Sequence, residues 1–200
     1  MKGSVIKYRI IRKSVKYPRL ELWGNELRII VPKNMDPFRI VRENSSWISR
    51  QIEFVRKAGA LMDSLELIPR TKRKFRSLVQ RLVEEYGKEL NVRVNKVFVR
   101  KMKSCWGTCS SEKNITINRE AQFLPEKLIR YVIYHEICHL IKWRHDEEFN
   151  KLIAEKFPDY EDLDLQLQAY WMKIREMNES QNRSKFSWES DQRLSHDAFS

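Results

Sequence analysis

The fold is decided by residues 131–145, which read Tyr-Val-Ile-Tyr-His-Glu-Ile-Cys-His-Leu-Ile-Lys-Trp-Arg-His and contain the pattern H-E-x-x-H. In a helix, His135 and His139 lie one turn apart on the same face, so both imidazoles can reach one metal ion. Glu136 is rotated by about 100° from His135, so its carboxylate can reach a water on that ion instead of the ion itself. Zinc lowers the pKa of such a water to about 7, and a carboxylate beside it can accept the proton while the water attacks a carbonyl. These five residues predict a metal-dependent hydrolytic site.

The surroundings of the pattern favour a metal over a simpler alternative, a helix with two hydrogen-bonded histidines and a solvated glutamate. The flanking residues are apolar and predict a helix from Pro125 to about Ile141 that is buried on most sides. In such a helix a glutamate and two histidines would carry an uncompensated desolvation cost without a metal. Three of the four histidines of the chain also lie within residues 135–145.

A catalytic zinc usually has three protein ligands, and His145 is the best candidate for the third. It follows His139 by six residues, about 600° around an ideal helix, so a straight helix would point it away. We therefore expect the helix to end or bend between about Ile141 and Arg144, with Asp146 capping a new helix. Glu147 and Glu148 are the competing ligands, because other zinc hydrolases take a glutamate from the following helix.

Further side chains are candidates for the cleft around the metal. Trp106-Gly107 suits an edge strand that runs above an active site, because glycine allows close backbone approach, although a tryptophan packed in a turn explains it equally well. Asn118 is a candidate for a hydrogen bond near the cleft. Arg144, next to the third ligand, and its neighbour Lys142 are candidates for steadying an anionic transition state or binding phosphate.

Tyrosines and cysteines near the pattern have simpler interpretations. Tyr131 and Tyr134 can in principle donate to an oxyanion, but aromatic residues on a buried helix usually belong to the core. Cys105 and Cys109 lack a second cysteine pair, so buried free thiols are favoured over a second metal or a redox site. Cys138 is interpreted as a core residue.

The rest of the chain predicts a mixture of strands and helices. A small antiparallel β unit is expected over residues 4–31, with Gly24-Asn25 as a hairpin turn. Asp36-Pro37 predicts a helix start, followed by one broken or two short helices to about Lys57. Periodicity beyond the hinge at 59–70 predicts further helices at 71–90, 147–156 and 163–177 and strands at 91–102 and 115–117, and residues 178–200 read as a polar tail.

Composition sets the class of protein. The chain has 200 residues, 42% of them hydrophobic, with three cysteines and a net charge of +12. No apolar run approaches the roughly 18 residues needed to span a bilayer, and the basic N-terminus lacks the unbroken apolar stretch of a signal peptide. An odd cysteine count fits a reducing compartment, so we expect a cytoplasmic protein. Residues 1–100 carry an excess of basic side chains, which favours either a solvated surface or non-specific nucleic-acid binding.

A set of short motifs runs through the chain in a defined order: Ser-Cys-Trp-Gly-Thr-Cys at 104–109, Ile-Thr-Ile-Asn at 115–118, Leu124-Pro125, Tyr131-Val132, the H-E-x-x-H pattern with Leu140, His145, Phe149, and Phe-Pro-Asp-Tyr at 157–160. In this order and spacing the chain resembles the YgjP-like metallopeptidase family, predicted metal-dependent hydrolases related to the SprT-like and WLM zincins. The resemblance covers roughly residues 5–175. Two departures, Thr108 and Asp146 where serine is common in the family, do not touch the proposed ligands.

The resemblance implies a zincin-type catalytic domain with His135, His139 and His145 as metal ligands and Glu136 as the base. We thus expect an α+β, zincin-like metallopeptidase domain at 69–177, preceded by a β-rich and helical extension at 1–68 and followed by a flexible tail at 178–200. The expected function is zinc-dependent cleavage of peptide bonds. The alternatives are a metal-dependent nucleotide pyrophosphatase or other phosphohydrolase, which would take a small anionic substrate, and a nucleic-acid-associated protease.

Overall fold

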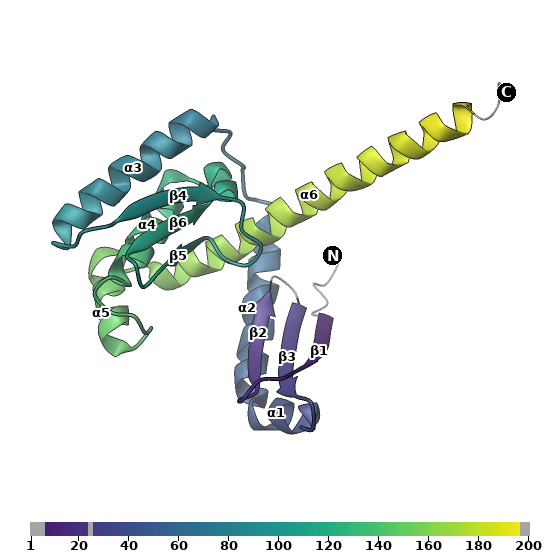
Figure 1. The fold of residues 1–200 in the computed structure, drawn as a ribbon, viewed down its shortest axis with the longest axis horizontal. Helices are drawn as coiled ribbons and strands as arrows, with labels where there is room; N and C mark the ends of the chain where they lie inside the picture. Colours follow the sequence, from purple (N-terminus) through teal and green to yellow (C-terminus); the bar gives the residue numbers. More distant parts are fainter. Residues whose placement is uncertain (1–6, 24–25, 197–200) are drawn as a thin grey trace. The chain divides into compact units, whose positions relative to one another are not determined.

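The computed structural model describes residues 7–23 and 26–196, and the chain forms two compact units. Of the described residues, the first unit contains those up to Ser64 together with those from Gln168 onward, and the second is Leu65–Leu167. Each unit combines a three-stranded sheet with helices, as Figure 1 shows, so the predicted α+β class is confirmed. The functional boundaries expected at 68/69 and 177/178 stay predictions.

The sheet of the first unit consists of β1 (Lys7–Lys13), β2 (Arg19–Trp23) and β3 (Glu26–Pro32) in the order β1-β3-β2. The expectation of a wholly antiparallel unit is wrong, because β1 runs parallel to β3. The most buried strand, β3, lies at the centre of the sheet. The chain reverses direction once after β1 and again after β2, so β1 and β3 run in the same direction. Only the β2–β3 pair is antiparallel, with Trp23 opposite Glu26, and the predicted turn at Gly24-Asn25 lies outside the described residues.

Two helices follow the sheet, as the sequence indicates. Helix α1 (Pro37–Glu43) is capped by Asp36, whose carboxylate accepts a hydrogen bond from the Phe38 amide at 3.0 Å. Helix α2 (Ser45–Met62) starts two residues after α1 ends and continues beyond the expected end at about Lys57. One face of the sheet packs on these helices through an apolar cluster: Leu27, Ile29, Val31 and Ile40, with Leu20, Met35, Val41, Trp47 and Ile48 around it.

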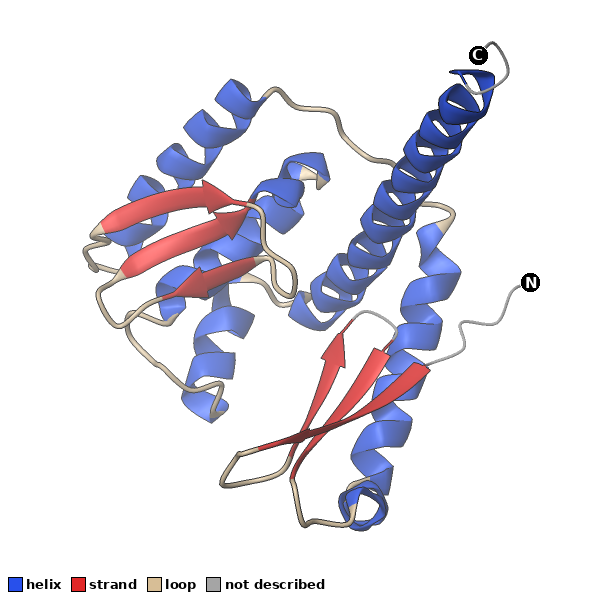
Figure 2. Ribbon diagram, turned by 45° about the vertical axis from the view of Figure 1, so that its right-hand side comes forward, coloured by secondary structure: helices blue, strands red, loops and turns tan. Residues whose placement is uncertain are grey.

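The second unit contains the H-E-x-x-H pattern of residues 135–139. Its elements are α3 (Lys72–Glu89), β4 (Lys96–Arg100), β5 (Gly107–Cys109), β6 (Asn114–Asn118), the short 3-10 helix η1 (Arg119–Phe123), α4 (Glu126–Cys138), α5 (Glu147–Lys156) and the first turns of α6 (Tyr160–His196). The strands have the order β4-β6-β5, with β4 parallel and β5 antiparallel to β6, so β5 is an edge strand. Helix α4 packs against β5 and β6. In Figure 2 their sheet is the one on the left, with helices behind it.

Helix α4 is almost wholly buried, as its apolar sequence predicts. Its buried side chains are Leu128, Ile129, Tyr131, Val132, Ile133, Tyr134, Glu136, Ile137 and Cys138. The helix ends at Cys138, about three residues before the predicted end, because tight hydrogen bonds from the Leu140 and Ile141 amides to the carbonyls of Ile137 and Cys138 replace the regular helical pattern. The backbone therefore turns directly after the second histidine of the pattern.

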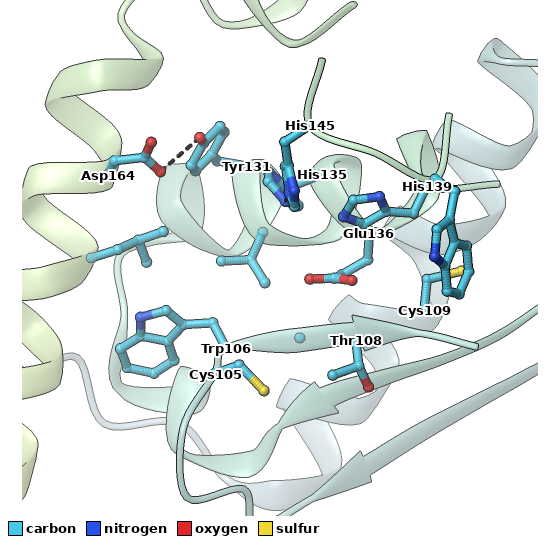
Figure 3. Close-up of a pocket in the computed structure, with 14 residues that line it drawn as sticks. Cys105, Trp106, Thr108, Cys109, Tyr131, His135, Glu136, His139, His145 and Asp164 are labelled. Carbon is cyan, nitrogen blue, oxygen red and sulfur yellow. Dashed lines mark hydrogen bonds between the residues drawn. The ribbon is translucent and has the colours of Figure 1, made fainter. Parts of the chain in front are cut away.

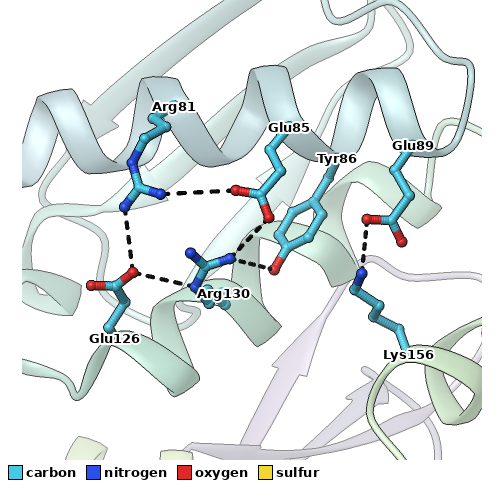
Figure 4. A network of polar contacts seen from close by, with 7 residues as sticks. All are labelled: Arg81, Glu85, Tyr86, Glu89, Glu126, Arg130 and Lys156. Atoms are coloured by element: carbon cyan, nitrogen blue, oxygen red, sulfur yellow. Dashed lines mark hydrogen bonds and ion pairs between the residues drawn. The ribbon is translucent and has the colours of Figure 1, made fainter.

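Charged side chains hold α4 and α5 against α3 (Figure 4). The contacts are Arg130–Glu85 at 3.0 Å, Arg130–Glu126 at 3.2 Å, Arg81–Glu126 at 3.4 Å, Arg81–Glu85 at 3.9 Å, Arg130–Tyr86 at 3.5 Å and Lys156–Glu89 at 2.8 Å. Exposed ion pairs contribute little singly, but Arg130 is only partly exposed and bridges two helices. The network restricts sliding of α4, the helix that carries the H-E-x-x-H pattern.

Helix α6 corrects the expectation for the end of the chain. The sequence predicts a helix at 163–177, whereas one longer helix spans Tyr160–His196. The flexibility expected for the tail stays a prediction. The segment 178–196 contains no glycine or proline, so nothing in it interrupts a helix that has already been nucleated. The role of this segment stays a prediction.

Candidate metal centre

Three histidines converge in the second unit (Figure 3). His135 lies in the last turn of α4, His139 at its C-cap, and His145 in the loop before α5. One ring nitrogen from each lies within 4.8 Å of the other two, and the Nε2 atoms of His135 and His145 are 2.9 Å apart. Two imidazole lone pairs facing each other at this distance need a proton or a cation between them. The arrangement fits a metal ion with three imidazole ligands.

The second nitrogen of His139 supports the same assignment. Its Nδ1 lies 3.2 Å from the carbonyl oxygen of Lys142, which fits an Nδ1–H donor. In the neutral ring, this hydrogen bond selects the tautomer with the proton on Nδ1 and directs the lone pair of Nε2 toward the other histidines. Histidine ligands in proteins typically donate their other N–H to a carbonyl or carboxylate in this way. The tight turn after Cys138 thus both redirects the chain and orients the imidazole of His139, a candidate ligand.

Burial favours the neutral form of two of these imidazoles, those of His135 and His145. The pKa of His135 is lowered to about 3, first by burial and then by the neighbouring His145 and His139. The pKa of His145 is also lowered, by burial and by His139. A neutral imidazole is the form that binds a metal ion, so both side chains are available as ligands at neutral pH.

Phe149 forms the wall behind the three histidines. Its ring, 1% exposed, lies 4.9 Å from the ring centroid of His135, 4.7 Å from that of His139 and 4.7 Å from that of His145. Asp146 holds the start of α5 in place, since its carboxylate accepts a hydrogen bond from the Phe149 amide at 3.0 Å, as predicted for a helix cap. One aromatic side chain therefore restricts the orientation of all three imidazoles.

The competing third ligands point elsewhere. Glu147 forms an ion pair with Lys151, and Glu148 forms one with Lys142. Neither glutamate lines the pocket or lies in the histidine group. The loop geometry therefore favours His145.

Glu136 lies beside the histidines and faces the same pocket. It is 7% exposed, and burial raises the pKa of its carboxyl to about 8. It accepts no hydrogen bond from the part of the chain that the structure describes. A dication held by the histidines would favour the carboxylate form, which would then be free to accept a proton.

Gly107 makes room for this carboxylate. A Cβ atom at position 107 would lie 2.5 Å from Cγ, 2.7 Å from Oε1 and 2.8 Å from Cδ of Glu136. Gly107 does not adopt a left-handed backbone conformation, so space alone explains the glycine. The close approach of an edge strand to the site, one of the two interpretations of Trp106-Gly107, agrees with this geometry.

The substitution Gly107→Ala should therefore displace Glu136 while leaving the histidines in place. A misplacement of about 1 Å in a catalytic group can cost about a hundredfold in rate, so kcat/KM should fall by that order. Metal content, measured by elemental analysis, should stay stoichiometric. Gly87→Ala in α3, where the nearest atom would be the Val92 carbonyl oxygen at 3.2 Å, is the matched control and should keep its activity. Full activity in Gly107→Ala would contradict the argument.

The pocket has a volume of about 540 Å³. It is lined by Cys105, Trp106, Gly107, Thr108, Cys109, Tyr131, Val132, His135, Glu136, His139, Trp143, His145, Asp164 and Leu167. It thus brings together the three histidines, Glu136, Trp106 and Gly107. Trp143 and Asp164 were missed, because neither belongs to a pattern that indicates a site.

Two predicted cleft residues do not line the pocket. Asn118 is fully buried, and its amide holds the loop before β5 by donating to the carbonyls of Cys105 at 2.9 Å and Met102 at 3.2 Å. Its oxygen accepts hydrogen bonds from the Met102 and Glu120 amides. Asn118 thus acts on the pocket indirectly, by fixing the strand that carries Gly107. Arg144 is exposed and outside the pocket lining.

The tyrosines of α4 are tied to protein groups. The Tyr131 hydroxyl donates to Asp164 Oδ1 at 2.8 Å, and the Tyr134 hydroxyl donates to the Leu152 carbonyl at 3.4 Å. Burial is the main cause that raises the pKa of both phenols. Cys105, Cys109 and Cys138 are free thiols, and Cys138 is fully buried, as predicted for a core residue.

Comparisons with known proteins agree with this class of site. Residues 12–170 match the family described as YgjP-like, metallopeptidase domain, and the chain belongs to this family. It is an enzyme, a metal-dependent hydrolase of the metallopeptidase class.

Solved structures similar to the chain include two metallopeptidase zymogens. One is jannalysin of Methanocaldococcus jannaschii, with 22% identity, a TM-score of 0.40, and coverage of 45% of this chain and 91% of that one. The other is abylysin of Pyrococcus abyssi, with 23% identity, a TM-score of 0.38, and coverage of 52% of this chain and 95% of that one. No curated protein matches the chain.

Proposed function

We propose that the protein is a zinc-dependent peptidase in which His135, His139 and His145 hold the ion and Glu136 is the general base. The observation that carries the proposal is the convergence of three imidazole nitrogens within 4.8 Å beside a buried carboxylate in one pocket. Three imidazoles with an open fourth position suit catalytic zinc, although other divalent transition metals accept the same ligands. When bound, the ion supplies Lewis acidity toward a carbonyl and toward water.

In the proposed reaction, each side chain of the pocket and its surroundings has a distinct role. Glu136 accepts the proton of the attacking water at its carboxylate and can pass it to the leaving amine. Gly107 and Asn118 keep β5 close to that carboxylate, and Phe149 keeps the imidazoles oriented. The walls at Trp106 and Leu167 exclude water from part of the pocket.

Hydrolysis of a phosphate ester fits the pocket less well. Arg144 and Lys142, the basic side chains expected to bind phosphate, do not line it, and Lys142 is paired with Glu148. The charged side chains of the lining, apart from the histidines, are the carboxylates of Glu136 and Asp164, which would repel a polyphosphate. A phosphohydrolase with a Mg²⁺ pair would need a second cluster of metal ligands. Among the described residues, the histidine triad is the one cluster that could hold a metal ion.

Other expectations stay predictions: a cytoplasmic location, and nucleic-acid binding by the basic residues of the N-terminal half, which salt-dependent binding to DNA would test. Within the described part of the chain, every helix is too short or too polar to cross a membrane.

Metal analysis of the purified protein, followed by turnover assays, tests the proposal. We expect about one zinc per chain, cleavage of casein, and no release of phosphate or pyrophosphate from nucleoside triphosphates. Removal of the metal by a chelator should abolish cleavage, and zinc should restore it. Hydrolysis of nucleoside triphosphates without cleavage of casein would replace the proposal by the phosphohydrolase alternative.

A further inference from the structure

One end of the pocket contains a carboxylate that the proposed chemistry does not use. Asp164 lies in α6, and Figure 3 shows it joined to Tyr131, with Glu136 and the histidines further along the pocket. The Tyr131 hydroxyl donates to Oδ1 at 2.8 Å. Oδ2 has neither a hydrogen bond nor an ion pair within the described part of the chain, and the side chain is exposed. One carboxylate oxygen is thus held in place while the other is open to a ligand.

The surface around Asp164 is apolar and lacks a compensating positive charge. Trp106, Val132 and Leu167 line the pocket together with Asp164 and Tyr131, and the lining contains no lysine or arginine. A carboxylate on such a surface attracts a cation more strongly than one on a polar surface, because fewer water dipoles screen it. The aliphatic part of a lysine or arginine side chain would also find apolar contacts there.

The position of Asp164 links this carboxylate to the reacting bond. Its partner Tyr131 lies one helical turn before His135 in α4, and the two rings are 6.2 Å apart between centroids, edge to face. A peptide whose scissile bond lies at the histidines therefore places a neighbouring residue near Asp164.

We propose that Asp164, positioned by Tyr131, is a specificity subsite that binds a cationic group of the substrate: the side chain of lysine or arginine, or a free N-terminal ammonium. The cation donates a hydrogen bond to Oδ2, while Tyr131 keeps Oδ1 and prevents the carboxylate from rotating away. This inference rests on the proposed peptidase function and adds the substrate class to it.

The test compares peptides that differ in one charge. The probes are acetylated, amidated alanine octapeptides with Lys, Gln or Glu at one position at a time, and an all-alanine peptide with a free amino terminus. The metal-loaded full chain should cleave the Lys peptide at one position at least about tenfold more efficiently in kcat/KM than the Gln peptide, the preference that a hydrogen bond to a charged group provides. If only the peptide with the free amino terminus is cleaved with a higher kcat/KM than the peptides with blocked termini, the bound cation is the N-terminal ammonium.

Variants at position 164 assign the preference to this residue. Asp164→Asn should reduce the Lys-to-Gln ratio of kcat/KM to about one, and Asp164→Lys should shift the preference toward Glu. Asp162→Asn is the matched control, because Asp162 is exposed on the same helix and does not line the pocket, and it should keep the ratio. Metal content and thermal unfolding of Asp164→Asn verify that the fold is retained.

Binding of the same peptides to the metal-loaded Glu136→Gln variant, measured by calorimetry, separates this proposal from the peptidase function. The subsite is supported if the Lys or free-amine peptide binds more tightly than the neutral peptides and this difference is lost in the double variant Glu136→Gln/Asp164→Asn. That result would stand even if the wild type cleaved none of the peptides. In that case only the proposed peptidase function would fail. Equal binding of the cationic and neutral peptides, or a preference that survives Asp164→Asn, overturns the subsite.

Discussion

Replacement of His135 or His139 by alanine is expected to remove the metal and abolish hydrolysis together. Each imidazole supplies one of only three protein ligands in the proposed site, and the ring nitrogens already converge within 4.8 Å. Even partners outside the ligand shell change metal affinity by about 10–100-fold, so loss of a ligand should exceed a hundredfold. Elemental analysis after dialysis, and peptide cleavage on the same sample, measure both effects.

His145 should behave in the same way, and its neighbours provide the control. His145→Ala should lose the metal, whereas Glu147→Gln and Glu148→Gln should retain it, because both glutamates form ion pairs with lysines outside the pocket. The reverse pattern would move the third ligand to α5. Stoichiometric metal and full turnover in His135→Ala or His139→Ala would show that the site is wrongly assigned.

Local patterns in the sequence were enough to predict that His135, His139 and His145 converge. The H-E-x-x-H spacing places two imidazoles on one helical face, and the six-residue step to His145 requires a turn between them. The structure contains that turn and the Asp146 cap that follows it. Such features depend on residues close in sequence, whose geometry is restricted by the helix itself.

Features that depend on distant segments were predicted less well. Asp164 reaches the pocket only because α6 packs beside α4, and no local periodicity indicates that contact. The parallel pairing of β1 with β3 likewise depends on which strand takes the centre of the sheet. Asn118, predicted as a candidate for a hydrogen bond near the cleft, does not line the pocket, and its side chain bonds to backbone groups of Met102, Cys105 and Glu120.

The structure also shows why Glu136, the proposed general base, is sensitive to its surroundings. Glu136 is 7% exposed, has a glycine instead of a larger side chain next to its carboxylate, and accepts no hydrogen bond among the described residues. A carboxylate surrounded in this way is a strong proton acceptor for its type, since neither water nor protein donors stabilise its charge. Since this carboxylate forms no hydrogen bond among the described residues, its replacement should not destabilise the fold.

Glu136→Gln should therefore retain the metal and lose turnover. The amide has nearly the same shape as the carboxyl group and leaves the three imidazoles untouched, so elemental analysis should still find about one ion per chain. The amide cannot accept the proton of the attacking water, and a positioned general base contributes about 10²–10⁴-fold, so kcat should fall within that range. Single-turnover cleavage of casein measures the loss.

Substrate affinity should change little in this variant, because the carboxylate acts on the water and not on the peptide. Glu136→Gln should then hold its substrates without cleaving them, and mass spectrometry of the material that it captures from cell extract should identify polypeptides. Loss of the metal would make the glutamate a structural residue. Unchanged turnover with the metal bound would mean that another group accepts the proton, and Asp164, the other carboxylate of the pocket lining, would be the first residue to test.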